Sequence, residues 1–201
     1  DGYKYKNKII FFLIARKKKL FFSVSNVIFN HDLDDNVLFL VKEKLKKFIN
    51  LMDYPDGPFH SEFIINKKKI DLVECHPRAI GYNIYNIFIN KLYGVNMYDL
   101  EIYGLNNKMI KKFSKTLFSN FCIRFFDIKR DGRLKKIKIL KNKLKNVRLF
   151  THLYFKKNDL VQFSKTDTSR FGYVFALSNN RLDLIKITKK FQKKNFVVQY
   201  Y

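Results

Sequence analysis

The chain has 201 residues, of which 47% are hydrophobic and 17% aromatic, and its formal net charge is +24. This aromatic content excludes a disordered chain, and the length allows one sizeable core with a small appended lobe. Cys75 and Cys122 stand too far apart for a metal or redox motif. No apolar run approaches the roughly 20 residues of a membrane span, so we expect no membrane and a reduced, cytoplasmic setting.

The positive charge is a first functional hint, because strongly basic proteins often bind nucleic acids. The lysines are, however, spread from Lys4 to Lys194 and accompany abundant Asn, Ile, Phe and Tyr. The codons of an AT-rich genome would produce such a bias. We therefore interpret the basic residues mainly as solvent-exposed surface side chains, whose charge favours an acidic ligand such as a nucleotide. Nucleic acid is not the expected partner.

The first half of the chain predicts strands, then a long helix, then a second hairpin. Its predicted elements are strands at 9–14 and 20–28 joined by a basic turn at 16–19, a helix at 37–52 capped by 34–36, and strands at 59–65 and 70–75. A helix from about residue 82 should stop at Gly94, because glycine commonly terminates helices.

The second half predicts further short elements with turn signals between them. They are a helical stretch at 107–118, strands at 120–127, 147–155, 160–164, 171–177 and 196–200, and a helix from Asn179 or Asn180 to about 193. Residues 129–148 are strongly basic, with a turn at Asp131-Gly132. Together these patterns predict an α+β chain with antiparallel hairpins.

The most informative stretch is the predicted hairpin 57–78, GPFHSEFIINKKKIDLVECHPR. Alternate residues of a strand share a face, so a turn centred on Lys68 would place Glu62 directly across from Glu74. Facing carboxylates repel one another unless a cation lies between them. Hard oxygen ligands around an open position suit Mg²⁺, which takes its remaining ligands from water and phosphates.

The same alternation predicts the rest of this face. It should hold His60, Glu62 and Ile64 from the first strand, and Ile70, Leu72, Glu74 and His76 from the second, with Ile64 opposite Leu72. The apolar members argue against a wholly solvent-facing side. Two other interpretations stay open: an edge hairpin with carboxylates balanced by lysines, and a transition-metal site of two histidines and two carboxylates, His60, Glu62, Glu74 and His76.

The segment 57–78 resembles the ATP-grasp superfamily, which includes biotin carboxylase, carbamoyl phosphate synthetase and the amino-acid ligases. The family pattern has a Glu on one strand and E-x-N-x-R on the next; here Glu62 is followed by Glu74-Cys75-His76-Pro77-Arg78. The resemblance implies that Glu62, Glu74 and His76 hold Mg²⁺, or Mn²⁺ as the alternative ion, against the phosphates of ATP. It also implies that Arg78 acts on the acyl phosphate and its precursors.

The resemblance covers residues 1–105 well and 147–201 loosely. It implies the C-terminal lobe of the ATP-grasp fold over 1–105, followed over 106–201 by a helical, basic connector and a small α+β C-terminal subdomain. Arg16 and Lys17 stand where such enzymes often have basic residues near the phosphates, so they are candidate ATP contacts. His76 replaces the usual Asn, which changes the geometry and pH dependence of metal binding.

The implied function is an ATP- and Mg-dependent ligase that joins a carboxylate to an amine, or to another nucleophile, through an acyl phosphate. ATP binds between two lobes in this family, and we expect only one of them here, so the chain alone should be inactive. The chain could then be a fragment of a longer enzyme, half of a split enzyme or a degenerate relative, and the sequence agrees with each of these interpretations. The expected partners are small-molecule carboxylate and amine substrates and an N-terminal lobe in the same or another chain, and a homodimer is kept as an option. The alternative function is a basic module that binds polyanions without catalysis.

Overall fold

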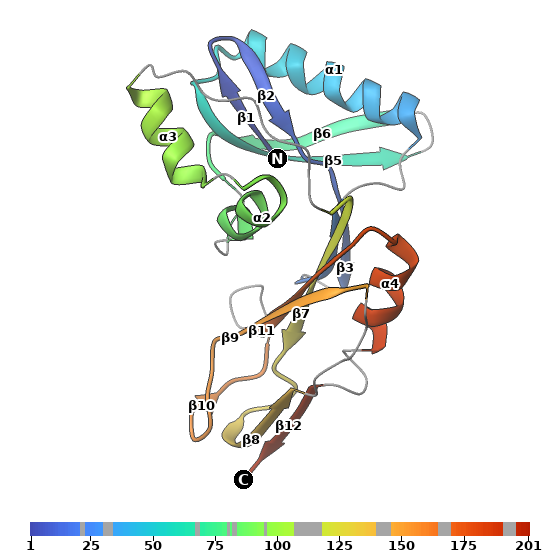
Figure 1. Cartoon of the computed structure of the whole chain (residues 1–201), viewed down its shortest axis with the longest axis vertical. Helices are drawn as coiled ribbons and strands as arrows, with labels where there is room; N and C mark the ends of the chain where they lie inside the picture. Colours follow the sequence, from blue (N-terminus) through green and yellow to red (C-terminus); the bar gives the residue numbers. More distant parts are fainter. Residues whose placement is uncertain are drawn as a thin grey trace. The chain divides into compact units, whose positions relative to one another are not determined.

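The computed structural model describes residues 1–20, 23–29, 34–66, 69–79, 81, 84–94, 96–106, 118–139, 146–164, 170–190 and 196–201. The chain divides into two compact units, drawn together in Figure 1. The first unit combines Asp1–Ile14 with Asp32–Leu117, and the second combines Ala15–His31 with Phe118–Tyr201. No helix among the described residues is both long and apolar enough to cross a membrane.

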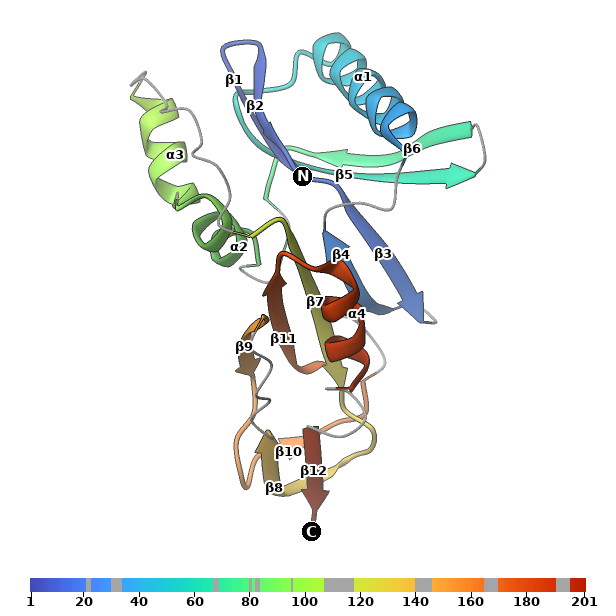
Figure 2. The same cartoon turned by 45° about the vertical axis from the view of Figure 1, so that its right-hand side comes forward.

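The first unit is built on a four-stranded antiparallel sheet in the order β2-β1-β5-β6. Its strands are β1 (Gly2–Tyr5), β2 (Lys8–Phe12), β5 (Gly57–Asn66) and β6 (Lys69–His76). The long helix α1 (Asp35–Leu51) lies along the β5–β6 side of the sheet, as Figure 2 shows.

The sequence pattern explains why α1 forms where it does. The Asp34 side chain accepts a hydrogen bond of 2.8 Å from the backbone N–H of Asn36, which caps the helix as predicted. Val41, Leu45 and Ile49 repeat every four residues and are buried on one face. Leu45 and Ile49 pack in one cluster with Phe59 of β5, which fixes the helix on the hairpin. The predicted helix is thereby confirmed.

Two shorter helices complete the described part of the first unit. Helix α2 (Ile84–Tyr93) ends before Gly94, whose φ of +68° is the left-handed conformation expected of a helix-terminating glycine. Helix α3 (Met97–Leu105) was not predicted; it is capped by Asn96, and its Met97 and Leu100 share a core cluster with Tyr3 of β1. Nearly all of the helical stretch predicted at 107–118 lies outside the described residues.

The second unit holds two antiparallel sheets. The larger has the order β3-β4-β7-β11-β9, with β3 (Ala15–Leu20), β4 (Ser23–Phe29), β7 (Asn120–Asp127), β9 (Arg148–Leu153) and β11 (Arg170–Ser178). The smaller has the order β10-β8-β12, with β8 (Gly132–Ile139), β10 (Leu160–Val161) and β12 (Phe196–Tyr200), and helix α4 spans Arg181–Lys190. The α+β fold class is therefore confirmed.

Strand β11 is the centre of the second unit. Every residue of it is buried, and it pairs with β7 on one side and β9 on the other. On one face Ala176 packs with Leu184 and Ile187 of α4. Gly172 allows β9 to come close, because a Cβ at this position would overlap the backbone carbonyl of His152.

One predicted element is wrong. Residues 16–19 do not form a turn but lie in strand β3, which pairs with β4 so that Lys17 faces Val27. β3 is the edge of its sheet, where lysines are well tolerated because their charge discourages further strand pairing. The β3–β4 hairpin also joins β7 of the second unit, so the residues predicted as one lobe, 1–105, are shared between the two compact units.

Candidate metal centre

The β5–β6 hairpin sets the geometry of the predicted site. Glu62 is the cross-strand partner of Glu74, as predicted, but the next residue, Phe63, pairs with Leu72. Val73 is therefore an extra residue that forms a β-bulge on β6. The turn is one residue tighter than predicted, since Asn66 pairs with Lys69, and the bulge compensates for this difference.

The bulge also changes which side chains share a face. Leu72 pairs with Phe63, which packs against the core under α1, so Leu72 lies on the helix side of the hairpin and not beside Glu74. The predicted pair of Ile64 and Leu72 is wrong: Ile64 pairs with Asp71 and is 60% exposed. The carboxylates consequently share a polar, solvent-accessible face with the exposed Ile64, whereas Ile70 and Leu72 lie on the opposite face.

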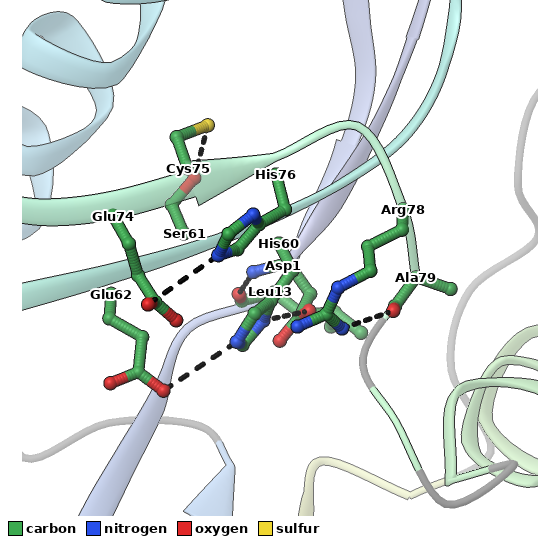
Figure 3. A network of polar contacts seen from close by, with 10 residues as sticks. All are labelled: Asp1, Leu13, His60, Ser61, Glu62, Glu74, Cys75, His76, Arg78 and Ala79. Atoms are coloured by element: carbon green, nitrogen blue, oxygen red, sulfur yellow. Dashed lines mark hydrogen bonds and ion pairs between the residues drawn. The ribbon is translucent and has the colours of Figure 1, made fainter.

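That face gathers imidazole and carboxylate groups, as Figure 3 shows. His60 Nε2 lies 3.6 Å from Glu62 Oε1, and His76 Nε2 lies 3.4 Å from Glu74 Oε2. His60, Glu62 and Glu74 each place one ligand atom within 4.8 Å of the others, so among the described residues these three form a group that could hold a metal ion. His76, predicted as a ligand, is not in this group; it is the cross-strand partner of His60 and lies beside Glu74, so its role as a ligand stays a prediction.

Exposure increases across the site from one end to the other. The side chain of His60 is 5% exposed and that of Glu62 24%, whereas those of Glu74 and His76 are 41% and 44% exposed. The site thus has a buried side at His60 and an open side at His76. A ligand that enters from solvent would meet the Glu74 and His76 side first.

Asp1 supports the buried side of the site. Its carboxylate lies 2.8 Å from His60 Nδ1, and its amino group donates a hydrogen bond of 2.9 Å to the carbonyl of Leu13. A carboxylate only accepts, so His60 carries its proton on Nδ1 in this contact and directs Nε2 toward Glu62. Sequence reasoning did not single out Asp1, because only the pairing of Gly2 with Phe59 brings it to the hairpin.

Two other groups near the hairpin are poor ligand candidates. Cys75 lies on the helix side, where it packs in the α1 cluster and accepts a hydrogen bond of 3.0 Å from the Ser61 hydroxyl. Burial, followed by the proximity of Cys75, raises the pKa of Tyr54, which keeps this phenol neutral. The side chains of the hairpin that could bind a cation therefore lie on the opposite, polar face.

The predicted basic residues fall in different places. Arg78 lies two residues after the end of β6; its side chain is exposed, and Nη1 donates a hydrogen bond of 3.0 Å to the carbonyl of Ala79 (Figure 3). Arg16 and Lys17 lie on β3, in the second unit. The roles of all three residues stay predictions.

No family model matches the sequence, and no curated protein matches it. Solved structures do match. A phosphoribosylglycinamide synthetase from Anaerococcus prevotii matches with a TM-score of 0.80 and 16% sequence identity, and the match covers 100% of this chain. An L-amino acid ligase from Bacillus licheniformis matches with a TM-score of 0.78 and 12% sequence identity, and this match also covers 100% of the chain. A third match is the biotin carboxylase domain dimer of the Hydrogenobacter thermophilus 2-oxoglutarate carboxylase, in complex with MgADP, ADP and bicarbonate. Its TM-score is 0.64 at 9% sequence identity, and the match covers 88% of this chain.

The extent of these matches is unequal. The chain spans 52%, 50% and 39% of those three chains, so it corresponds to about half of the first two proteins. At such low identity the likeness shows a shared fold, which extends over the whole length of this chain in the first two comparisons.

Proposed function

We propose that this chain, which has about half of the ATP-grasp fold, is part of an ATP-dependent ligase that joins a carboxylate to an amine, or to another nucleophile, through an acyl phosphate. The observation that carries the proposal is the facing pair Glu62 and Glu74, whose spacing in the sequence resembles that of the family's metal ligands. The synthetase and the amino acid ligase with the same fold support the reaction class.

In this proposal Glu62, Glu74 and His76 hold the divalent cation that accompanies ATP. The fit is reasonable, because two carboxylates face each other across the strands and the side of Glu74 and His76 is open to solvent. The cation would neutralise charge on the phosphoryl group as it transfers. The binding of MgADP by a biotin carboxylase of the same fold supports magnesium.

The remaining roles follow from charge and position. Arg78 would stabilise the anionic acyl phosphate, since its exposed side chain lies two residues beyond the strand that carries Glu74. Arg16 and Lys17 would contact the phosphates of ATP. The other ATP-grasp lobe would come from the same or another chain, and a small-molecule carboxylate and an amine would be the substrates.

Metal-dependent ATP binding tests the proposal. We would titrate Mg²⁺–ATP by calorimetry into the intact protein that carries this chain, and into its Glu62→Gln/Glu74→Gln variant. Glu43→Gln, an exposed carboxylate on α1, is the matched control. We expect at least about tenfold weaker binding in the double variant alone, because each lost carboxylate ligand removes a charge-assisted contact to the cation. Equal binding by all three proteins would overturn the proposal.

The alternative, a basic module that binds polyanions without catalysis, has one structural observation in its favour. The second unit has a cavity of about 790 Å³ lined by Lys129, Arg130 and Lys135, with Arg130 4.5 Å from the centre of the Tyr200 ring. Glu62→Gln should leave polyanion binding unchanged or slightly tighter, whereas it should abolish the ligase. A Lys129→Ala/Arg130→Ala variant should weaken polyanion binding and leave the ligase active.

A further inference from the structure

We propose that the hairpin binds its cation through imidazole nitrogen as well as carboxylate oxygen, so that the site prefers a first-row transition ion such as Mn²⁺ or Zn²⁺ to Mg²⁺. This rests on the proposed function for the reaction, but the metal preference depends only on the residues of this hairpin and on Asp1, which contacts His60. His60 then becomes a ligand, although it has no counterpart in the Glu and E-x-N-x-R pattern.

The first step concerns the donor atoms. His60 and Glu62 project from the same face of β5, and Glu74 projects beside them from β6, with one ligand atom of each within 4.8 Å of the others. Magnesium prefers oxygen ligands in near-octahedral geometry, whereas imidazole nitrogen suits zinc, iron and related ions. A nitrogen atom inside this group therefore shifts its preference away from Mg²⁺.

The second step concerns how His60 is held. The imidazole and the Asp1 carboxylate that contacts Nδ1 are 5% and 6% exposed, so this pair is buried together. A metal-ligating histidine usually donates its other N–H to such a carboxylate, which fixes the ring and makes the ligating nitrogen more basic. Asp1 thus orients Nε2 toward Glu62, where a shared cation would lie.

The third step concerns His76. It occupies the position where the family pattern has Asn, so an imidazole nitrogen replaces an amide oxygen there. Its Nε2 lies 3.4 Å from Glu74 Oε2, and it is the cross-strand partner of His60. His60, Glu62 and Glu74 are already grouped, and His76, which adjoins Glu74 on the same face, would complete a set of two histidines and two carboxylates suited to transition metals.

Metal titrations test the preference. Mg²⁺, Mn²⁺ and Zn²⁺, each without nucleotide, would be titrated by calorimetry into the full chain and into His60→Gln and Asp1→Asn variants. His152→Gln, an exposed histidine of the second unit, is the control. We expect Mn²⁺ and Zn²⁺ to bind at least about tenfold more tightly than Mg²⁺. Either variant should lower that affinity by about 10–100-fold while Mg²⁺ binding changes little.

Spectroscopy separates ligation from a merely structural role. Electron spin-echo spectra of bound Mn²⁺ should show ¹⁴N coupling from imidazole, and this coupling should weaken in His60→Gln but not in His152→Gln. Circular dichroism checks that each variant is folded, and Asp1→Asn provides a second, milder perturbation of His60. Magnesium binding as tight as Mn²⁺ binding, or absence of ¹⁴N coupling, would overturn the inference.

The outcomes also separate this inference from the proposed function. A transition-metal preference without metal-dependent ATP binding would support the inference and count against the ligase. Carboxylate-dependent Mg²⁺–ATP binding without a transition-metal preference would support the ligase and overturn the inference.

Discussion

At the scale of single residues, Glu62 and Glu74 face each other across the β5–β6 hairpin, and His60 lies beside them. The alternation of side chains placed Glu62 opposite Glu74, and the structure confirms this pair. The bulge at Val73 could not be foreseen, because nothing in the sequence of β6 distinguishes a bulged residue from a paired one. The contact of Asp1 with His60 could not be predicted from the sequence either, because it depends on the pairing of β1 with β5.

Tyr3 gives a residue-scale prediction about alkaline stability. Burial, followed by the charges of Glu101 and Asp56, raises the pKa of Tyr3 to about 12. In the unfolded chain the pKa is about 10, so the folded state holds its proton longer as the pH rises. This contribution to stability is complete below pH 10 and is lost progressively between about pH 10 and 12.

Urea unfolding from about pH 9 to 11.5 would measure the effect. We expect Tyr3→Phe to flatten the decline in the free energy of unfolding by about 2 kcal/mol over this pH range. Tyr98→Phe, which alters an exposed ring, should leave the decline unchanged. An identical pH profile for Tyr3→Phe and the unaltered chain would contradict the prediction.

At the scale of elements, strong local signals predicted structure well. Strand β7 has the predicted bounds of 120–127, and α1 has its predicted cap and apolar repeat. Helix α3 escaped prediction because it is short and exposes Tyr98, Ile102 and Tyr103, so its apolar residues do not follow one face. The lysine run of β3 looked like a turn because edge strands accept charge that interior strands exclude.

The packing of α3 on β1 yields an element-scale prediction. A Cβ on Gly104 would lie 2.8 Å from the Tyr3 hydroxyl, which donates a hydrogen bond of 3.0 Å to the carbonyl of Leu100. Gly104→Ala should therefore destabilise the chain by about 1–2 kcal/mol, because the buried hydroxyl must move and lose that bond. In a Tyr3→Phe background the same change should be neutral or stabilise by up to about 1 kcal/mol, since alanine favours helix.

A double-mutant cycle of Gly104→Ala and Tyr3→Phe, followed by urea unfolding, would measure this coupling. Additive effects of the two substitutions would show that the hydroxyl does not limit the space at residue 104.

At the scale of the whole molecule, the two units have separate cores. Leu45 and Ile49 pack with Phe59 in the first, and Leu184 and Ile187 pack with Cys122 in the second. The likeness to the ATP-grasp family was predicted from one hairpin and is confirmed at the level of the fold. The division into these two units was not foreseen, because strand pairing between distant segments leaves no local pattern.

Separate cores predict separate responses to damage. Leu45→Ala should cost about 2–5 kcal/mol, because it leaves a cavity beneath α1. Hydrogen exchange should then accelerate in α1, β5 and β6 while β7 and β11 keep their protection. Ile187→Ala in α4 is the reciprocal control, with acceleration confined to the second unit. Equal acceleration in both units after Leu45→Ala would contradict the prediction.

The interleaving of the two units has a consequence for biosynthesis. The β3–β4 hairpin emerges from the ribosome before α1, yet its partner β7 begins only at Asn120. During that interval β4 has an open edge, which is the kind of surface that pairs wrongly with other chains. Nascent chains stalled before residue 118 should therefore aggregate or recruit chaperones more readily than longer ones. A cut at the centre of the sequence would likewise separate a strand from its sheet rather than one folding unit from another.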